Sequence, residues 1–283
     1  NICSFFLDKA VSIGNYVALV FPKFLLNTPE FSQTRKYLSD KAVECIIDFG
    51  EKGFPGVLVE TLAIFINNLS RPSNTRVASI THGKFMIQSQ KYIFDDKLPY
   101  WIIYRDNEFD SVCKNLDFNV FKVFRDRQIT NKLLSPSGDI RVLKSRNISD
   151  DGKNVMDIDG YDSYISYDDA KNLSVYSYLD CDNVYLTPNM TYKPRMIEKP
   201  KECLVNGSLA VLIPKKGIIP TKEQLAFFST QEYRNFYQIA RNFQTRSLNV
   251  DACSVFFYGL LRDKAKKSPI TEKLDEKERL ILY

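Results

Sequence analysis

The chain has 283 residues, of which 44% are hydrophobic and 13% aromatic. This composition excludes an intrinsically disordered protein and supplies apolar material for one large or two ordinary domains. The formal net charge is +5, which permits a polyanionic partner without requiring one. The single histidine, His82, excludes a zinc site built on several histidines, and it excludes a Ser-His-Asp triad unless His82 is the base.

The cysteines and the hydropathy indicate in which cellular compartment the protein is expected. The six cysteines are scattered without a Cys-x-x-Cys pair, which indicates a reduced, cytoplasmic protein rather than a disulfide framework. The most apolar stretches, 16–26 and 57–66, are interrupted by polar residues and fall short of the roughly 20 residues that a span needs. No signal peptide and no membrane span are therefore expected. The sequence begins at Asn1 inside a helical pattern, and we expect it to be a fragment of a longer protein.

The first elements alternate between helix and strand. Residues 2–11 place apolar side chains at helical spacing and predict an amphipathic helix. Tyr16–Phe21 is an almost uninterrupted apolar run, which is typical of a strand buried on both faces. Thr28 and Pro29 are an N-cap and a first-turn residue, and they predict a second helix that ends near Asp40.

Two more strands are expected at Val43–Ile47 and Val57–Ile66. The order of elements predicts an α/β fold, specifically the second half of a doubly wound sheet, with a crossover followed by a strand pair. The loop between the two strands carries Phe54 and Pro55 among three glycines. Its glycine spacing opens a strand and no helix, so a dinucleotide-binding loop is excluded.

A large apolar ring on a tight polar loop has two interpretations. Phe54 either folds back onto the sheet as a core residue, which is the commoner position of aromatic side chains, or lies at the surface and stacks on a flat ligand.

Five stretches in this order carry a resemblance to a known family: Phe5–Ala10, Tyr16–Pro22, Arg35–Leu38, Ile46–Gly50 and Gly53–Pro55. Together they resemble the N6-adenine-specific DNA methyltransferases. Within that family the chain is similar to the Taq-type enzymes of restriction–modification systems, which keep a target-recognition domain C-terminal to the catalytic domain. The resemblance implies that residues 1–83 are the end of a Rossmann-like methyltransferase sheet.

The resemblance also implies roles for three residues. An adenine inside a duplex is flipped into a pocket and held by stacking; the position of the family's stacking ring is Phe54, followed by Pro55. The family's ring beside the adenine of S-adenosylmethionine matches Phe6. Ordinary helix–sheet packing is the alternative for Phe6.

The chain departs from the family in lacking the Asn-Pro-Pro-Tyr motif and the glycine-containing methyl-donor motif. Both would precede residue 1. We therefore expect this chain alone to be inactive and not to bind S-adenosylmethionine. No metal site is expected, because the acidic segment with Asp157-Ile-Asp-Gly160 lacks the remaining ligands of a calcium loop.

Residues 84–115, which include the only tryptophan, Trp101, are predicted to be a connector lying across the first domain, after one more edge strand at Val77–Thr81. Residues 116–283 are predicted to be an α+β DNA target-recognition domain. Within this domain, strands are expected at Val184–Leu186, Cys203–Val205 and Leu209–Ile213.

Helices are expected from Arg125 and Thr221 and over Gln231–Phe243, and residues 140–147 are predicted to be a strand with basic side chains. The tail after Arg262 is expected to be a terminal helix or a frayed end.

The second domain is rich in cations, with seven against two acids between Val120 and Asn147. Arginine, lysine and asparagine reach phosphates and base edges, and a solvated basic face is the alternative. The predicted DNA-binding residues are Arg125, Arg127, Lys132, Lys144, Arg146, Asn147, Lys193, Arg195, Lys215, Lys216, Arg241 and Arg246.

Two functions of different classes are compatible with the sequence. The first is part of a site-specific DNA adenine-N6 methyltransferase, in which this chain mainly recognises double-stranded DNA. The second is a non-catalytic specificity module that docks onto a separate methyltransferase or nuclease subunit. A small-molecule methyltransferase fits poorly, because a small substrate gives no reason for a large basic domain. A restriction nuclease, as a subunit or a domain, is a further expected partner.

Overall fold

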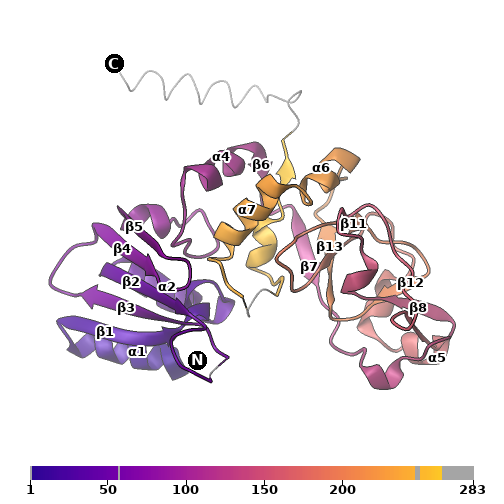
Figure 1. Ribbon diagram of the computed structural model, residues 1–283, viewed down its shortest axis with the longest axis horizontal. Helices are drawn as coiled ribbons and strands as arrows, with labels where there is room; N and C mark the ends of the chain where they lie inside the picture. Colours follow the sequence, from indigo (N-terminus) through magenta and orange to yellow (C-terminus); the bar gives the residue numbers. More distant parts are fainter. Residues whose placement is uncertain (1, 57, 246–248, 263–283) are drawn as a thin grey trace, which may run out of the picture.

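The computed structural model describes residues 2–56, 58–245 and 249–262. In these residues the protein is a mixed α/β structure with sheets of five, four, three and two strands. Two lobes stand apart and are joined by a central group of helices (Figure 1). None of the helices in the described ranges combines the length and the apolar character that crossing a bilayer requires.

The first lobe is a five-stranded sheet with two helices. Its elements are α1 (Ile2–Ile13), β1 (Tyr16–Pro22), η1 (Lys23–Leu26), η2 (Pro29–Phe31), α2 (Ser32–Ser39), β2 (Ala42–Gly50), β3 (Thr61–Asn67), β4 (Asn74–Ser79) and β5 (Lys84–Ser89). The strand order is β1-β3-β2-β4-β5. Strand β3 runs antiparallel to both of its neighbours, so β1 and β2 point the same way with β3 inserted between them.

The expected helix at residues 2–11 is confirmed by α1, but two strand predictions are wrong in part. The strand expected from Val57 begins at Thr61, so the loop that holds Phe54 is longer than predicted. Strand β1 was expected to be buried on both faces, yet only Val17 and Phe21 are buried while Tyr16 and Val20 are exposed. The reason is its position, because β1 lies at the edge of the sheet and, among the described residues, pairs with β3 alone.

The sheet continues beyond the expected connector boundary. The strand expected at Val77–Thr81 is β4, which lies inside the sheet, and the edge is formed by β5. Strand β5 falls in the segment predicted to be a connector. The domain boundaries at residues 83 and 115 themselves stay a prediction.

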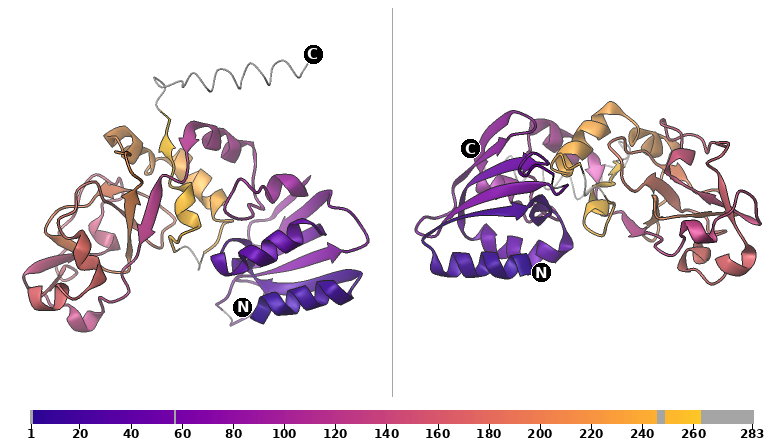
Figure 2. Two further views of the ribbon diagram at one scale, coloured as in Figure 1. Left: turned by 180° about the vertical axis from the view of Figure 1, so that it is seen from behind. Right: turned by 60° about the horizontal axis from the view of Figure 1, so that its bottom comes forward.

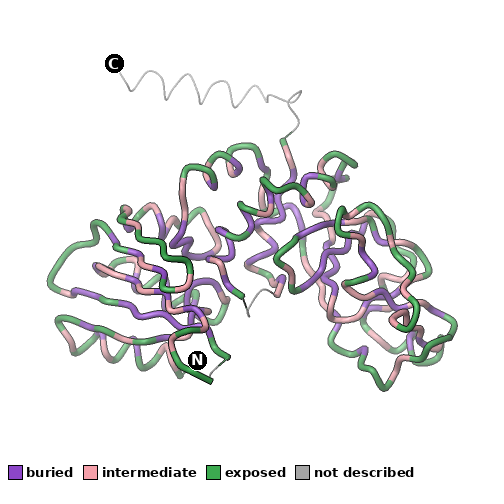
Figure 3. Tube along the Cα trace, in the orientation of Figure 1, coloured by how far each residue is buried: buried purple, intermediate pink, exposed green. Residues whose placement is uncertain are grey.

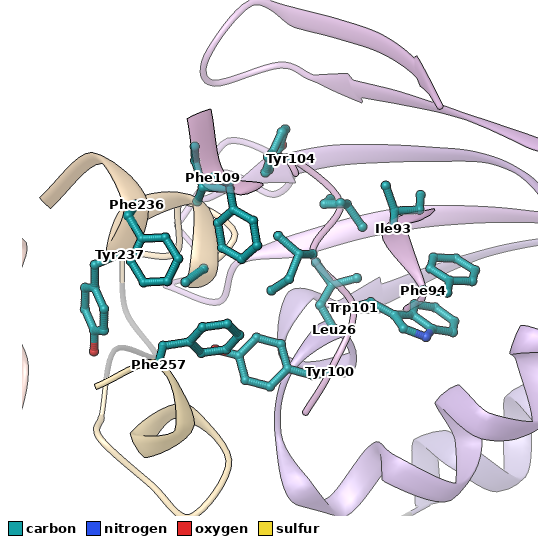
Figure 4. Close-up of a cluster of buried hydrophobic side chains, with 14 of the residues drawn as sticks. Leu26, Ile93, Phe94, Tyr100, Trp101, Tyr104, Phe109, Phe236, Tyr237 and Phe257 are labelled. Atoms are coloured by element: carbon teal, nitrogen blue, oxygen red, sulfur yellow. The ribbon is translucent and has the colours of Figure 1, made fainter. Parts of the chain in front are cut away.

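A continuous hydrophobic core joins the first sheet to the central helices. These helices are α3 (Gln90–Ile93), α4 (Asn107–Asn115), α7 (Gln231–Ala240) and η6 (Ser254–Phe257). Trp101 stacks on Phe94 with ring centroids 3.7 Å apart, and Phe109 stacks on Phe236 at 4.9 Å. Figure 4 shows these rings in one group that reaches from the first lobe to α7 and η6. The aromatic residues of the expected connector are therefore core residues.

The second lobe contains a four-stranded and a three-stranded sheet around a core of its own. Its strands are β7 (Phe121–Phe124), β8 (Ile140–Leu143), β9 (Ser163–Ile165), β10 (Tyr185–Pro188), β11 (Ile197–Glu198), β12 (Cys203–Val205) and β13 (Leu209–Pro214). Short helices lie at α5 (Tyr167–Ala170), η3 (Asn131–Leu133), η4 (Ser145–Asn147) and η5 (Ser174–Tyr178). A two-stranded pair, β6 (Leu116–Asp117) with β14 (Leu260–Leu261), joins the central region.

The three strands expected in the second lobe are confirmed, as is helix α6 (Lys222–Phe227), whose N-cap Thr221 accepts a hydrogen bond from the backbone of Gln224. The helix expected from Arg125 is wrong. The side chain of Asp126 accepts hydrogen bonds from the backbone N–H groups of Gln128 and Ile129, and this local bonding holds a turn in place of a helix.

Two further element limits differ from the sequence prediction. The basic strand expected over residues 140–147 ends at Leu143 and continues as the helical turn η4. Helix α7 ends at Ala240 instead of continuing to Phe243, since Asn242 and Phe243 adopt positive φ angles of 50° and 51°. The expected terminal helix lies outside the described residues from residue 263 onward.

Candidate functional site: the Phe54 loop and its anchors

The loop between β2 and β3 holds Phe54 at the surface. The ring is 47% exposed, so the interpretation as a core residue folded back onto the sheet is not what the structure shows. Pro55 is also exposed. Gly50, at the start of the loop, has a φ of +54°, a conformation that glycine adopts without a steric penalty. A Cβ at Gly53 would lie 2.4 Å from Thr61 Oγ1, so this position also requires glycine.

A buried charge network fixes both ends of the Phe54 loop. Lys23, which is fully buried, places its Nζ 2.7 Å from Asp48 Oδ2 and 3.7 Å from Glu60 Oε1. Asp48 precedes the loop and Glu60 follows it. Tyr104 donates its hydroxyl proton to Asp48 Oδ2 at 2.5 Å, and burial, followed by the charge of Asp48, raises the pKa of Tyr104. Buried charges persist only when they are paired and hydrogen-bonded, and these groups satisfy one another.

A segment from the far end of the chain binds back onto this loop. We call residues 241–245 the anchor segment. The backbone N–H of Thr245 donates to both carboxylate oxygens of Glu60, at 3.1 and 3.0 Å, and its hydroxyl donates to Glu51 in the Phe54 loop. Tyr192, from the second lobe, donates its hydroxyl proton to the carbonyl of Thr245 at 2.6 Å. The anchor segment thus connects the Phe54 loop to the second lobe.

Other residues of the anchor segment bind the first lobe through paired amides. Gln244 and Asn27 exchange two side-chain hydrogen bonds, at 2.5 and 3.2 Å. Asn242 accepts from the backbone of Ile103 at 2.9 Å and donates to the carbonyl of Trp101 at 2.8 Å. These side chains are buried, so each hydrogen bond also prevents an unpaired polar group from being left in the core.

The ring of Phe243 packs between three side chains at the edge of the first sheet. Its centroid lies 4.9 Å from that of His82 and 5.2 Å from that of Tyr104, and Lys84 Nζ lies 4.5 Å above it. The pocket beside these rings has a volume of about 100 Å³, far below the roughly 300–1,000 Å³ of ligand sites. This contact therefore serves to hold the anchor segment and offers no room for a base.

His82 gives a direct measure of whether the anchor segment is docked. Desolvation by its neighbours, and then the charge of Lys23, lower the pKa of His82 below its usual value. Replacing Phe243→Ala should solvate the imidazole and raise its pKa toward about 6.5. Because His82 is the only histidine, one imidazole proton resonance in an NMR pH titration measures this. Gln128→Ala, in the second lobe, is the control and should leave the titration unchanged; an unchanged pKa in Phe243→Ala would contradict the packing.

The predicted cofactor residue, Phe6, lies on α1. Its ring is 69% exposed, because α1 packs on the sheet through Leu7 and Val11. The alternative of ordinary helix–sheet packing is therefore wrong for this residue.

Several predicted DNA-binding residues are engaged inside the protein. Asn147 is fully buried and binds Met156 O and Asp162 Oδ1. Arg195 is buried and donates to the carbonyls of Ser145 and Ile148. Arg241 is buried and donates to the Tyr100 hydroxyl and the Asn249 carbonyl. We leave these three out of the proposed DNA surface, because each holds local backbone in place.

Three more predicted residues are half-buried. Lys144 Nζ bonds to Ser163 Oγ and lies 3.9 Å from the ring centroid of Tyr161. Lys215 Nζ donates to Asn119 Oδ1, and Arg125 has a pKa lowered by desolvation and then by Arg127. Arg246 lies outside the described residues. The predicted residues that are exposed are Arg127, Lys132, Arg146, Lys193 and Lys216.

The residues that support Phe54 are not among the predicted site residues. Lys23 and Glu60 interrupt the apolar stretches 16–26 and 57–66, and a lone charge inside such a stretch is the signal of a buried pair that could have identified them. Thr245 gave no signal, since its partners are 185 and 194 residues away along the chain.

No protein-family model and no curated protein matches the chain. Among solved structures it is similar to the type IIG restriction endonuclease BpuSI, with 11% identity and a TM-score of 0.36 over 98% of this chain and 44% of that one. It is also similar to the type IIL restriction-modification enzyme MmeI in complex with DNA, with 10% identity and a TM-score of 0.44 over the same shares. The chain thus spans less than half of either protein, and at these low TM-scores the likenesses establish no shared activity.

Proposed function

We propose that this chain is part of a site-specific DNA adenine-N6 methyltransferase, in which Phe54 stacks on an adenine flipped out of the duplex and residues 116–283 mainly recognise the DNA. The observation that carries the proposal is the Phe54 loop. An exposed ring on a loop whose two ends are fixed by buried charges is available for stacking on a flat partner. Fixed ends lower the conformational entropy that the loop must lose on binding.

The link between the Phe54 loop and the second lobe supports the same function. Enzymes that flip a base must hold the duplex while the base enters a pocket. The anchor segment joins the loop to Tyr192 of the second lobe, and the exposed Lys193 follows Tyr192 directly. Contacts of the second lobe with phosphates would therefore set the position of Phe54.

The methyl donor is proposed to be S-adenosylmethionine, held mainly by residues outside this chain. A ring that stacks on the adenine of the donor must be exposed, and Phe6 meets that condition. When bound, the donor supplies the methyl group, while the part of this chain in the reaction is to position the adenine and the DNA. Because the Asn-Pro-Pro-Tyr and methyl-donor motifs are both absent from its sequence, this chain alone is expected to transfer no methyl group.

DNA binding by this chain should depend strongly on salt. Each phosphate contact of a lysine or arginine contributes about −0.9 to the slope of log K against log salt concentration on B-DNA. Arg127→Gln and Lys193→Gln should each make the slope shallower by about 1 unit. Gel shifts or fluorescence anisotropy on duplex DNA at several salt concentrations measure this, with Lys9→Gln on α1 as the control. Binding that does not weaken as salt rises would contradict a cationic DNA surface.

The second candidate is a non-catalytic specificity module that docks onto a separate methyltransferase or nuclease subunit. The observation that favours it is the sheet face opposite α1 and α2, where the described residues leave Val20, Phe85 and Ile87 exposed. The two candidates differ in where the catalytic motifs are: a polypeptide containing this chain and an Asn-Pro-Pro-Tyr motif supports the first, and activity that appears only on adding another subunit supports the second.

A further inference from the structure

A second exposed apolar side chain stands on a loop that is tied to the Phe54 loop. Residues 189–196 connect β10 to β11 and carry Met190, which is 56% exposed. We call these residues the Met190 loop. Its Tyr192 donates to the carbonyl of Thr245, and the Thr245 hydroxyl donates to Glu51 of the Phe54 loop. Two hydrogen bonds through one residue therefore join the two loops, although the loops belong to different lobes.

The Met190 loop also lies where the two lobes meet. Its Thr191 and Tyr192 line the same small pocket as His82 of the first lobe and Phe243 of the anchor segment. In both further views the lobes lie on either side of α7, which leads into the anchor segment (Figure 2). The Met190 loop and the Phe54 loop therefore reach this junction from opposite lobes.

Buried side chains fix both ends of the Met190 loop. Asn189 is 3% exposed; its amide donates to the carbonyl of Gly207 at 3.1 Å and accepts from the backbone N–H of Val250 at 3.0 Å. At the other end the buried Arg195 donates to the carbonyl of Lys193 at 3.1 Å. The loop therefore has less conformational freedom to lose when a partner binds.

The position of Met190 distinguishes it from other exposed apolar residues of the second lobe. In this lobe the strands are mostly buried and the loops between them mostly exposed (Figure 3). Three further large apolar residues of these outer parts are exposed, namely Met156, Tyr167 and Ile219. Met156 follows η4, Tyr167 begins α5 and Ile219 precedes α6, whereas the Met190 loop binds the segment that holds the Phe54 loop.

The charges at this junction favour a polyanion as the partner of Met190. Exposed lysines stand on each contributing segment: Lys52 on the Phe54 loop, Lys84 at the start of β5 and Lys193 on the Met190 loop. Met190 and Tyr192 alone offer far less area than a protein interface, which takes about 800 Å² from each partner. Lysines bind phosphates, and a single apolar side chain, methionine included, is enough to enter between stacked bases.

We propose that Met190 enters the base stack of the DNA where the flipped adenine leaves it, and holds that gap open. A flipped base costs the stacking contacts of its neighbours, and an inserted apolar side chain replaces part of them. Because the Met190 loop is bound to the Phe54 loop through Thr245, the side chain that fills the gap and the ring that receives the base are positioned together. This role deepens the proposed methyltransferase function and rests on it.

A duplex with one abasic nucleotide tests the proposal, because its gap exists before the protein binds. Fluorescence anisotropy compares two duplexes of the same mixed sequence, one of them with an abasic nucleotide in place of an adenine, on the intact protein. The unsubstituted protein should bind the abasic duplex about tenfold more tightly, since no base has to leave the stack. Met190→Ala should bind both duplexes within about twofold, whereas Met190→Leu, an apolar replacement of similar volume, should keep the preference.

Met156→Ala, which removes another exposed methionine of the second lobe, is the control and should keep the preference for the abasic duplex. A preference that survives in Met190→Ala, or an equal loss of binding to both duplexes, would overturn the proposal. Salt-dependent binding of the unsubstituted protein without any preference would also overturn it and would leave the proposed DNA recognition standing. Absence of binding to either duplex would overturn both, so the two failures can be told apart.

Discussion

Replacing Lys23→Met should lower the free energy of unfolding by about 3–5 kcal/mol, the usual cost of removing one partner from a buried ion pair. Lys23 is 1% exposed and Asp48 is fully buried, so the substitution leaves two carboxylates, on Asp48 and Glu60, without their shared cation. Methionine keeps a similar length and an unbranched chain. The loss therefore reports the charge and not the volume. Urea unfolding followed by circular dichroism measures it.

The control for this substitution is Lys52→Met, a similar change at an exposed lysine of the Phe54 loop. Surface substitutions away from special features are usually within about 0.5 kcal/mol. A loss below about 1 kcal/mol in Lys23→Met would mean that the three charges do not act as one network. The double variant Lys23→Met with Asp48→Asn should recover part of the loss, because it removes one of the two uncompensated charges.

If the chain is part of the proposed methyltransferase, replacing Phe54→Ala in the intact protein should reduce methylation by about 5- to 150-fold, which corresponds to about 1–3 kcal/mol of lost stacking on the base. Duplex binding should change little, since the proposed phosphate contacts lie in the second lobe. Methylation is measured by methyl transfer to a duplex that holds the target site. A fluorescent adenine analogue, 2-aminopurine, at the target position measures the flipped state separately.

Two variants of the same loop accompany this test. Phe54→Tyr keeps the ring and should retain most of the activity, whereas Leu58→Ala removes another exposed apolar side chain and should have little effect. An equal loss of methylation and of duplex binding in Phe54→Ala would make Phe54 a structural residue. A similar loss in Leu58→Ala would mean that the loop as a whole, and no stacking ring, is required.

The sequence predicted the elements whose signals are local. Helix α1 follows from apolar spacing, α6 from the capping residue Thr221, and β12 and β13 from short apolar runs between turns. The exposure of Phe54 was one of two alternatives, since a ring between glycines and a proline is constrained by its neighbours in the chain. Such signals lie within a few residues of the element that they specify.

The features that the sequence did not predict depend on contacts between segments that are distant along the chain. The apolar run of β1 is compatible with burial on two faces, and only the pairing with β3 alone shows that β1 is an edge. The sequence around Arg195 is equally compatible with a DNA-binding surface and with hydrogen bonds to carbonyl groups of the protein itself. The fold settles this for Arg195, because it places the carbonyls of Ser145 and Ile148 within hydrogen-bond distance. Sequence spacing also gave no indication that Thr245 reaches Glu60.

The stacked pair of Trp101 and Phe94 has a practical consequence. Trp101 is the only tryptophan of the chain, and its carbonyl accepts a hydrogen bond from Asn242 in the anchor segment. Its intrinsic fluorescence therefore comes from one place, where the anchor segment binds the first lobe. Emission from the unlabelled protein can report, in real time, whether this contact opens when the proposed DNA partner is added.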